Sequence, residues 1–255
     1  PVINHCEVRA LSRSGDMHEG AVSARLGLSG VPSAAESVMV ARDCELALLT
    51  GGRLHIAHVS VAESIGYITR AKEKGIDVTS EVTPHHLTMS EEWVYGLQGR
   101  IPEAITMSSY DTNTKVNPPL RTTDDVYAVT KALSSGIIDA IATDHAPHAE
   151  VDKQCTYSDA ERGINVLETA FGSLMTLVHK GSIGLETLLE RLTIGPARII
   201  GSEAGSLIKG RPADVVLLDT DAEWTVDARS LASMSSNTPL SGVTFHGLVL
   251  ATLVG

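Results

Sequence analysis

The chain has 255 residues, of which 43% are hydrophobic and only 4% aromatic, enough for a sizeable core built mainly from aliphatic side chains. Its formal net charge of -11 argues against nucleic acid or an anionic membrane surface as a partner, because those partners need clustered lysine and arginine. No stretch approaches the roughly 20 apolar residues of a membrane helix, and the three cysteines are widely spaced, so we expect a cytoplasmic protein with free thiols that acts on a small molecule.

The chain opens with a predicted strand over residues 1–5, and the next predicted element is a helix over residues 33–50. Ser33 and Glu36 stand three residues apart at the start of this helix. That spacing predicts a capping box, in which each side chain bonds the backbone N–H of the other residue. Gly51 follows the last helical residue and is typical of a helix end.

Strands and helices continue to alternate, as in βα units around a parallel sheet. Residues 53–59 and 77–83 are predicted strands on either side of a helix over residues 62–74. Residues 89–120 then form an unusually long connection. Connections of that length are usually functional or disordered, so we expect a flap over a site.

The remaining predicted elements are a strand at residues 137–143 and helices at residues 122–134, 165–180 and 185–192. Beyond residue 205 the sequence becomes turn-rich, and residues 215–218 and 243–254 are β-like without helical periodicity. We therefore predict two parts: residues 1–205 belong to an α/β barrel, and residues 206–255 belong to a small β domain.

The number of strands suggests that the barrel is incomplete. A closed (β/α)8 barrel of typically about 250 residues has eight parallel strands, whereas four are predicted here. Residues 1–5 read as a strand with no element before them, and residues 248–255 stop inside an apolar β-like run. We expect a fragment of a longer protein, whose uncovered sheet edges favour poor solubility or self-association.

Three side chains stand at the ends of predicted strands: His5, His58 and Asp144. Barrel enzymes carry their chemistry at the carboxyl ends of their strands. Imidazole nitrogens and carboxylate oxygens are the ligands of Zn²⁺ in hydrolases. A single strand-end histidine is more often structural, and Asp144 alone could be a turn or N-cap residue. Three such residues facing one pocket favour a metal.

The other histidines near the strand ends are less indicative. Strand alternation sends His55 to the opposite face, where we expect a structural role. His85 and His86 could line the site or pack under the long connection, and we expect a structural role for both. His145 could hydrogen-bond a neighbouring ligand or simply pack, and His148, on the loop after Asp144, could bind a substrate carboxylate.

Residues 115–121, Lys-Val-Asn-Pro-Pro-Leu-Arg, combine two stiffening prolines with an amide and two cations. Such a loop could dock an anionic small molecule. It could equally be a rigid exit from the long connection, and on local sequence this second interpretation is slightly favoured.

Six segments together resemble the bacterial class of dihydroorotases, within the amidohydrolase superfamily. In family order they are Pro1-Val-Ile-Asn-His-Cys-Glu7, His55-Ile-Ala-His-Val-Ser60, Glu81-Val-Thr-Pro-His-His-Leu87, Lys115-Val-Asn-Pro-Pro-Leu-Arg121, Ala142-Thr-Asp-His-Ala-Pro-His148 and Leu167-Glu-Thr-Ala170. Hydantoinases and allantoinases resemble the same scaffold but typically have Cys-Pro in the third segment and a different pair before Pro-Pro. Val82-Thr83-Pro84 and Val116-Asn117 therefore favour dihydroorotase.

The resemblance implies a metal-dependent hydrolase barrel of the TIM (β/α)8 type, of which this chain would hold strands five to eight and part of a β-sandwich domain. It implies one or two Zn²⁺ ions: His5 and His58 would bind one metal, and Asp144 would bind the other and move a proton. The implied substrate contacts are Asn117, His148 and Gly163.

The implied reaction is the reversible ring closure of N-carbamoyl-L-aspartate to L-dihydroorotate in pyrimidine synthesis. The family's His-x-His-x-Arg motif does not occur in this sequence, so we expect the isolated chain to be inactive. Val8 also stands where the family commonly has Asp. Two alternatives remain: another cyclic amidase, such as a hydantoinase or allantoinase, and a non-catalytic scaffold for aspartate transcarbamoylase. A homodimer is also possible.

Overall fold

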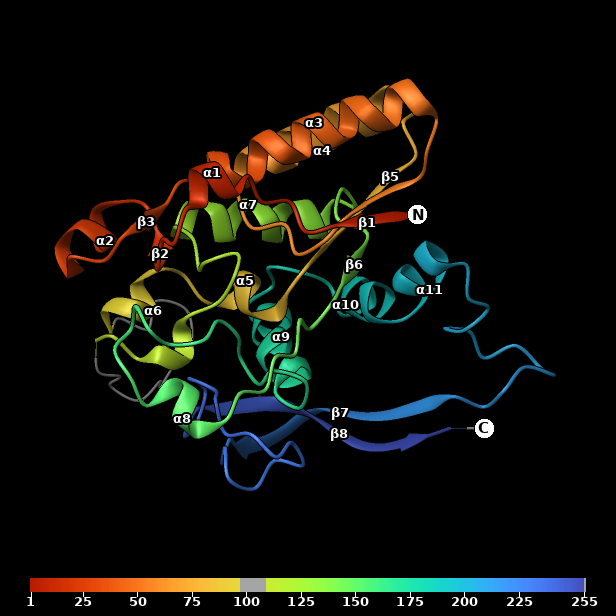
Figure 1. The fold of residues 1–255 in the computed structure, drawn as a ribbon. Coiled ribbons are helices and arrows are strands. Elements are labelled where there is room, and N and C mark those ends of the chain that lie inside the picture. Colours follow the sequence, from red (N-terminus) through yellow and green to blue (C-terminus); the bar gives the residue numbers. More distant parts are fainter. Residues whose placement is uncertain (97–108, 255) are drawn as a thin grey trace.

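A four-stranded parallel sheet lies at the centre of the computed structural model, which describes residues 1–96 and 109–254 (Figure 1). Its strands, in spatial order, are β1 (Val2–Asn4), β4 (Leu54–Ile56), β5 (Val78–Val82) and β6 (Ala140–Ile141). Each lies inside a strand predicted from the sequence. The predicted alternation of parallel strands with helices is therefore confirmed.

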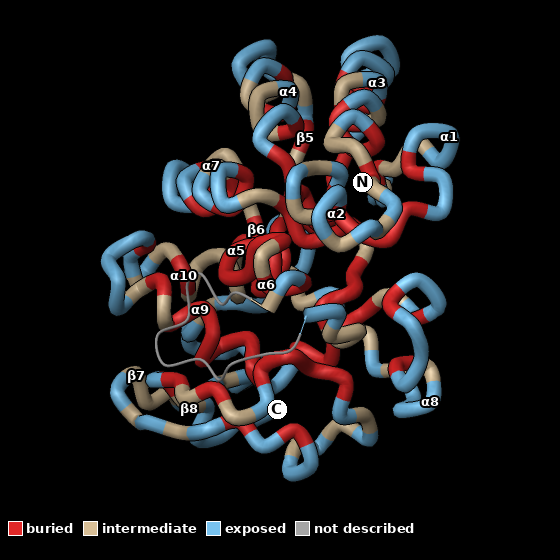
Figure 2. Tube along the Cα trace, turned by 90° about the vertical axis from the view of Figure 1, so that its left-hand side faces the viewer, coloured by how far each residue is buried: buried red, intermediate tan, exposed pale blue. Residues whose placement is uncertain are grey.

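Helices cover one face of this sheet (Figure 1). They are α3 (Ala34–Thr50), α4 (Ala62–Glu73) and α7 (Thr123–Ser134). Aliphatic side chains from the sheet and the helices, such as Val40, Ile56 and Ile68, form the main core. Figure 2 shows these buried segments inside and the exposed helix surfaces outside. No helix in the described part of the chain is both long and apolar enough to cross a bilayer.

The capping box predicted for α3 is wrong. Ser33 adopts helical backbone angles, and its side chain makes no capping hydrogen bond. The Glu36 carboxylate is instead buried, where it accepts hydrogen bonds from the Ser60 backbone N–H (3.1 Å) and the Ser64 hydroxyl (2.8 Å). Because the Glu36 carboxylate accepts hydrogen bonds from these buried donors, it does not accept one from the Ser33 backbone N–H, as a capping box requires.

In the described part of the chain after β6, three helices have seven or more residues: α9 (Ala170–His179), α10 (Leu185–Leu192) and α11 (Ile194–Ile200). The helix predicted from residue 165 starts five residues later. Val166 and Leu167 donate their backbone N–H groups to His145 Nδ1 (3.2 Å each), which holds this segment in a loop.

Several short elements were not predicted. Between β1 and α3 lie α1 (Arg9–Ser12), β2 (Met17–His18), α2 (Ala21–Leu26) and β3 (Gly30–Val31). Elsewhere lie α5 (Pro84–Thr88), α6 (Glu92–Tyr95), the 3-10 helix η1 (Thr112–Thr114) and α8 (Glu150–Lys153). Elements of two to six residues are too short to show a hydrophobic period.

The long connection was predicted to be a flap over residues 89–120. Its first part packs inside instead, because Met89 and Trp93 are fully buried in a second core cluster. Residues 97–108, the middle of the predicted flap, lie outside the described residues.

Near the C-terminal end, β7 (Val215–Thr225) and β8 (Thr244–Leu253) form a separate antiparallel ribbon, which confirms the predicted β character of this region. The ribbon packs against α9 at Gly172, where an added Cβ would lie 3.0 Å from the Phe245 Cβ. Glycine therefore allows the close approach of helix and ribbon. The division at residue 205 stays a prediction.

Candidate functional site

The three predicted metal ligands follow parallel strands of the same sheet. His5 follows β1, His58 follows β4 and Asp144 follows β6. The carboxyl ends of parallel strands meet at one edge of a sheet, which is where barrel enzymes place their chemistry. Asn117 reaches the same place from the loop before α7, with its Nδ2 3.4 Å from His5 Nε2.

The His5 and His58 rings face each other edge to face, with 2.8 Å between His5 Nδ1 and His58 Nε2. His58 is buried, whereas the His5 side chain is 41% exposed. Burial, followed by the nearby His5, lowers the pKa of His58, while the Asp144 carboxylate acts in the opposite direction. The net lowering favours the neutral imidazole, which is the form that binds a metal.

Two of these residues have unusual backbone angles. His58 and Asp144 have φ values of +35° and +48°, although neither is glycine. Non-glycine residues seldom adopt positive φ, and such strained positions concentrate at functional sites.

The donor chemistry fits part of a metal shell. Two imidazole nitrogens converge, and the carboxylate of Asp144 is near enough to influence His58. Among residues 1–96 and 109–254, however, no three His, Cys, Asp or Glu side chains gather into a group that could hold a metal by themselves. Zn²⁺ in a hydrolase usually has three protein ligands and an open position, so His5 and His58 would supply two of the three.

Two further predicted substrate contacts, His148 and Gly163, lie against each other. An added Cβ at Gly163 would lie 2.8 Å from His148 Nε2, and the residue has a φ of +147°, so only glycine fits here. His148 Nε2 lies 3.0 Å from the Arg162 carbonyl oxygen. Gly163 donates its N–H to the Lys115 carbonyl (2.8 Å). These contacts tie the loop after β6 to the Asn117 loop.

The cations at the ends of the Asn117 loop are not available to dock an anion. Lys115 is buried; its ammonium donates to the Ser158 carbonyl (2.8 Å) and lies 3.4 Å from an Asp16 carboxylate oxygen. Arg121 is also buried, at 2% exposure. The structure supports the interpretation of this loop as a rigid connection that presents Asn117.

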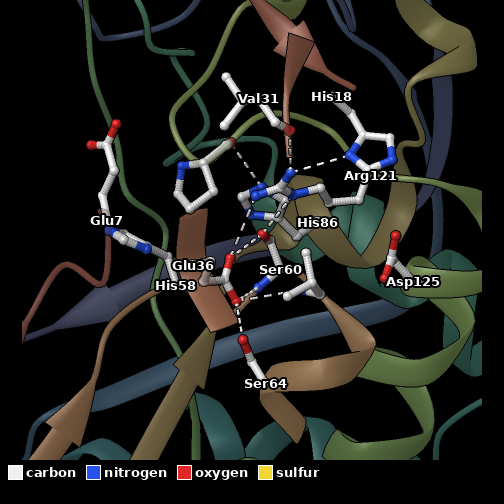
Figure 3. Close-up of polar contacts among 12 residues, drawn as sticks. Glu7, His18, Val31, Glu36, His58, Ser60, Ser64, His86, Arg121 and Asp125 are labelled. Carbon is white, nitrogen blue, oxygen red and sulfur yellow. Dashed lines mark hydrogen bonds and ion pairs between the residues drawn. The ribbon is translucent and has the colours of Figure 1, made fainter. Parts of the chain in front are cut away.

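Arg121 is the centre of a buried polar network (Figure 3). Its guanidinium donates to the Ser60 hydroxyl (3.0 Å) and the Val31 carbonyl (3.1 Å), and lies 3.8 Å from the Glu36 carboxylate. Ser60 in turn donates to Glu36 through both its backbone and its hydroxyl. The network thus holds the segment just after His58, and sequence patterns gave no indication of it.

Most of the remaining histidines have structural partners. His55 has its ring nitrogens 2.8 Å from the Thr79 hydroxyl and 3.1 Å from the Glu81 carboxylate. His86 has its nitrogens 2.8 Å from the Thr83 hydroxyl and 3.0 Å from the Pro118 carbonyl. Both therefore match the structural role expected for them. His85 is buried, and neither of its nitrogens has a partner among the described residues.

Glu91, near the Arg121 network, provides a test of pH dependence. Burial, reinforced by Glu92 and Asp125, raises its pKa from 4.5 to about 7. A pKa that is higher in the folded than in the unfolded state means that stability falls as the pH rises between these values. At pH 8 we expect the free energy of unfolding of Glu91→Gln, measured with urea, to exceed that of the wild type by up to about 3 kcal/mol. At pH 4 we expect the two proteins to be equally stable.

The matched control for this prediction is Glu45→Gln, because the Glu45 side chain is 69% exposed. We expect this variant to show no comparable gain at pH 8. Two results would contradict the conclusion that Glu91 is ionised and buried at pH 8. One is an equal gain in stability for both variants, and the other is a gain for Glu91→Gln that is the same at pH 4 and pH 8.

Comparisons with known proteins agree on one family. The model of the amidohydrolase family matches residues 4–255. Among curated proteins, dihydroorotases from Anaeromyxobacter dehalogenans (strain 2CP-1) and Pelotomaculum thermopropionicum are each 48% identical over 255 residues, which is 100% of this chain. The chain spans 56% and 57% of those two proteins, so it covers little more than half of their length.

Solved structures show the same fold. The L-hydantoinase from Arthrobacter aurescens has a TM-score of 0.82 at 27% identity, over 99% of this chain and 55% of that chain. The dihydropyrimidinase from Brevibacillus agri has a TM-score of 0.81 at 23% identity, with the same coverage. The parallel strands and their helices are thus part of a TIM-type barrel, and the predicted fold class is confirmed.

Proposed function

The chain belongs to the amidohydrolase family, and on that premise we propose that the protein is a zinc-dependent dihydroorotase, which interconverts N-carbamoyl-L-aspartate and L-dihydroorotate. The observation that carries this proposal is the match of the whole chain to proteins named dihydroorotase. The solved hydantoinases and dihydropyrimidinase are more distant in sequence, so dihydroorotase is preferred to another cyclic amidase.

In this proposal His5 and His58 hold one zinc ion through the two nitrogens that face each other. Bound zinc would polarise the ring carbonyl and make the attacking water more acidic. Asp144 would accept the proton of that water and deliver it to the ring nitrogen as the amide bond breaks, acting first as base and then as acid. Its exposed position at a strand end suits a group that must reach both atoms.

Asn117 and His148 are the proposed substrate contacts. Asn117 lies beside His5. If His148 Nε2 donates to the Arg162 carbonyl, Nδ1 is the nitrogen left for a substrate carboxylate, and it can donate only when the imidazole is protonated. Gly163 stays a proposed backbone contact. The number of zinc ions, a homodimer, a transcarbamoylase partner and a cytoplasmic location stay predictions.

The proposal is tested by substrate profiling with zinc present, on the 255-residue chain and on a protein extended upstream through a His-x-His-x-Arg motif. We expect the extended protein to hydrolyse L-dihydroorotate, and the chain alone to be inactive. Turnover of hydantoin without turnover of dihydroorotate would replace the proposal by a different cyclic amidase. Zinc retention without turnover of either compound would favour the scaffold.

A further inference from the structure

Glu7 joins two residues of the proposed site through one carboxylate. Its Oε2 lies 3.0 Å from His5 Nε2 and accepts a hydrogen bond from Asn117 Nδ2 at 3.2 Å. Its other oxygen accepts a hydrogen bond from the Ser12 hydroxyl at 2.5 Å. The carboxylate therefore links the end of β1, helix α1 and the Asn117 loop.

This arrangement determines which nitrogen of His5 is available to a metal. An ionised carboxylate only accepts hydrogen bonds, so His5 Nε2 must carry the proton that it shares with Glu7. In the neutral ring Nδ1 then has the lone pair, and Nδ1 is the nitrogen that faces His58 Nε2 at 2.8 Å. A carboxylate behind a ligating histidine fixes its ring orientation and makes it a stronger ligand.

The same carboxylate orients the Asn117 amide. Because Asn117 Nδ2 donates to Glu7, the amide oxygen of Asn117 points away from this carboxylate. The oxygen has no hydrogen-bond partner among the described residues. The backbone of the loop is fixed nearby by the contact of the Pro118 carbonyl with His86 (3.0 Å). A fixed carbonyl oxygen is an acceptor for an N–H group, such as those of a cyclic ureide.

We propose that Glu7 is a positioning residue, which presents His5 Nδ1 to the metal and the Asn117 amide oxygen to an N–H group of the substrate. This inference rests on the proposed metal site and goes further by naming the group that orders it. Glu7 contacts neither metal nor substrate in this proposal. The Glu7 side chain is 18% exposed and that of His5 is 41% exposed, so the pair contributes little to folding stability.

The test is long-range ¹H–¹⁵N NMR of the histidine rings, together with Zn²⁺ titration against a competing chelator. In the wild-type chain we expect His5 in the Nε2–H form, with a ring proton protected from exchange with water. In Glu7→Met that protection is lost, and zinc affinity falls about 10- to 100-fold. Glu7→Gln retains an acceptor oxygen, so it should keep the protected proton and lose less affinity.

The matched control is Glu81→Met, which removes the carboxylate beside His55, a histidine of β4 whose ring nitrogens contact Thr79 and Glu81. This variant should leave the His5 proton and the zinc affinity unchanged. An Nδ1–H form of His5 in the wild type, or an unchanged zinc affinity in Glu7→Met, would overturn the inference. If Glu7→Met fails to fold, the wild-type spectrum and Glu7→Gln still decide.

These readouts need no substrate, so they separate the two proposals. If the extended protein does not hydrolyse dihydroorotate but the Glu7 variants behave as expected, only the proposed reaction is contradicted. Normal turnover with an unaffected Glu7→Met variant would count against the role of Glu7 alone.

Discussion

Replacement of His58 by alanine is expected to reduce the affinity for Zn²⁺ by more than about 100-fold, because losing even a residue that supports a ligand costs 10- to 100-fold. His58 is buried at the end of β4, with its Nε2 facing His5 Nδ1. No other described nitrogen lies in that position to replace it. Calorimetric titration of the chain with Zn²⁺ measures the effect.

His55→Ala is the matched control for this prediction. His55 lies three residues earlier in the same segment and is buried to a similar degree, but its ring contacts Thr79 and Glu81 instead. We expect this variant to lose stability and to keep its zinc affinity. If His55→Ala weakened zinc binding as much as His58→Ala, the ligand assignment would be wrong.

Replacement of Arg121 by methionine is expected to lower the free energy of unfolding by about 3–5 kcal/mol, because it leaves the buried Glu36 carboxylate without its counter-charge. Arg121 and Glu36 have side chains that are 2% and 4% exposed, and their charged groups lie 3.8 Å apart. The carboxylate would keep hydrogen bonds from Ser60 and Ser64. The expected loss therefore combines the missing counter-charge with a buried Val31 carbonyl that has lost its Arg121 donor. Urea unfolding at neutral pH measures it.

Two further variants make this result specific. Arg198→Met removes an arginine that is 67% exposed and pairs with Glu190 at 3.4 Å, and it should cost less than about 1 kcal/mol. The double variant Arg121→Met with Glu36→Gln should recover part of the loss, since it no longer buries an unpaired charge. A single Arg121→Met variant as stable as Arg198→Met would contradict the account of the network.

The sequence predicted the parts of the site that depend on strand ends. His5, His58 and Asp144 were identified because each directly follows an apolar run, and parallel strands bring their carboxyl ends together. The structure places His5 Nδ1 against His58 Nε2, a proximity that residues 53 positions apart do not reveal by themselves. Their role as metal ligands stays a proposal.

Residues that act through others could not be predicted in the same way. Glu36 was assigned to a helix cap because its spacing from Ser33 matched a local motif, whereas its partners lie 24 to 28 residues further along the chain. Arg121 was considered only as one of two cations in a loop that could dock an anion, because charged residues are seldom fully buried and a buried role for it was not predicted. Glu7 offered one usable indication, since it stands two residues after His5.

The fold was predictable where elements are long, as in α3 and α4, and not where they are short. The unit between β1 and α3 contains strands of two residues, which carry no period. The start of α9 depends on a side chain distant in sequence, because His145 accepts the N–H groups of Val166 and Leu167.

The central claim is that His5 and His58 hold a metal together. Anomalous diffraction at the zinc edge, from crystals of the chain grown with Zn²⁺, tests it most directly. We predict a peak bonded to both His5 Nδ1 and His58 Nε2, at about 2.0–2.1 Å from each. A structure with no anomalous peak between these nitrogens, or with zinc bound at His55 and Glu81 instead, would contradict the claim.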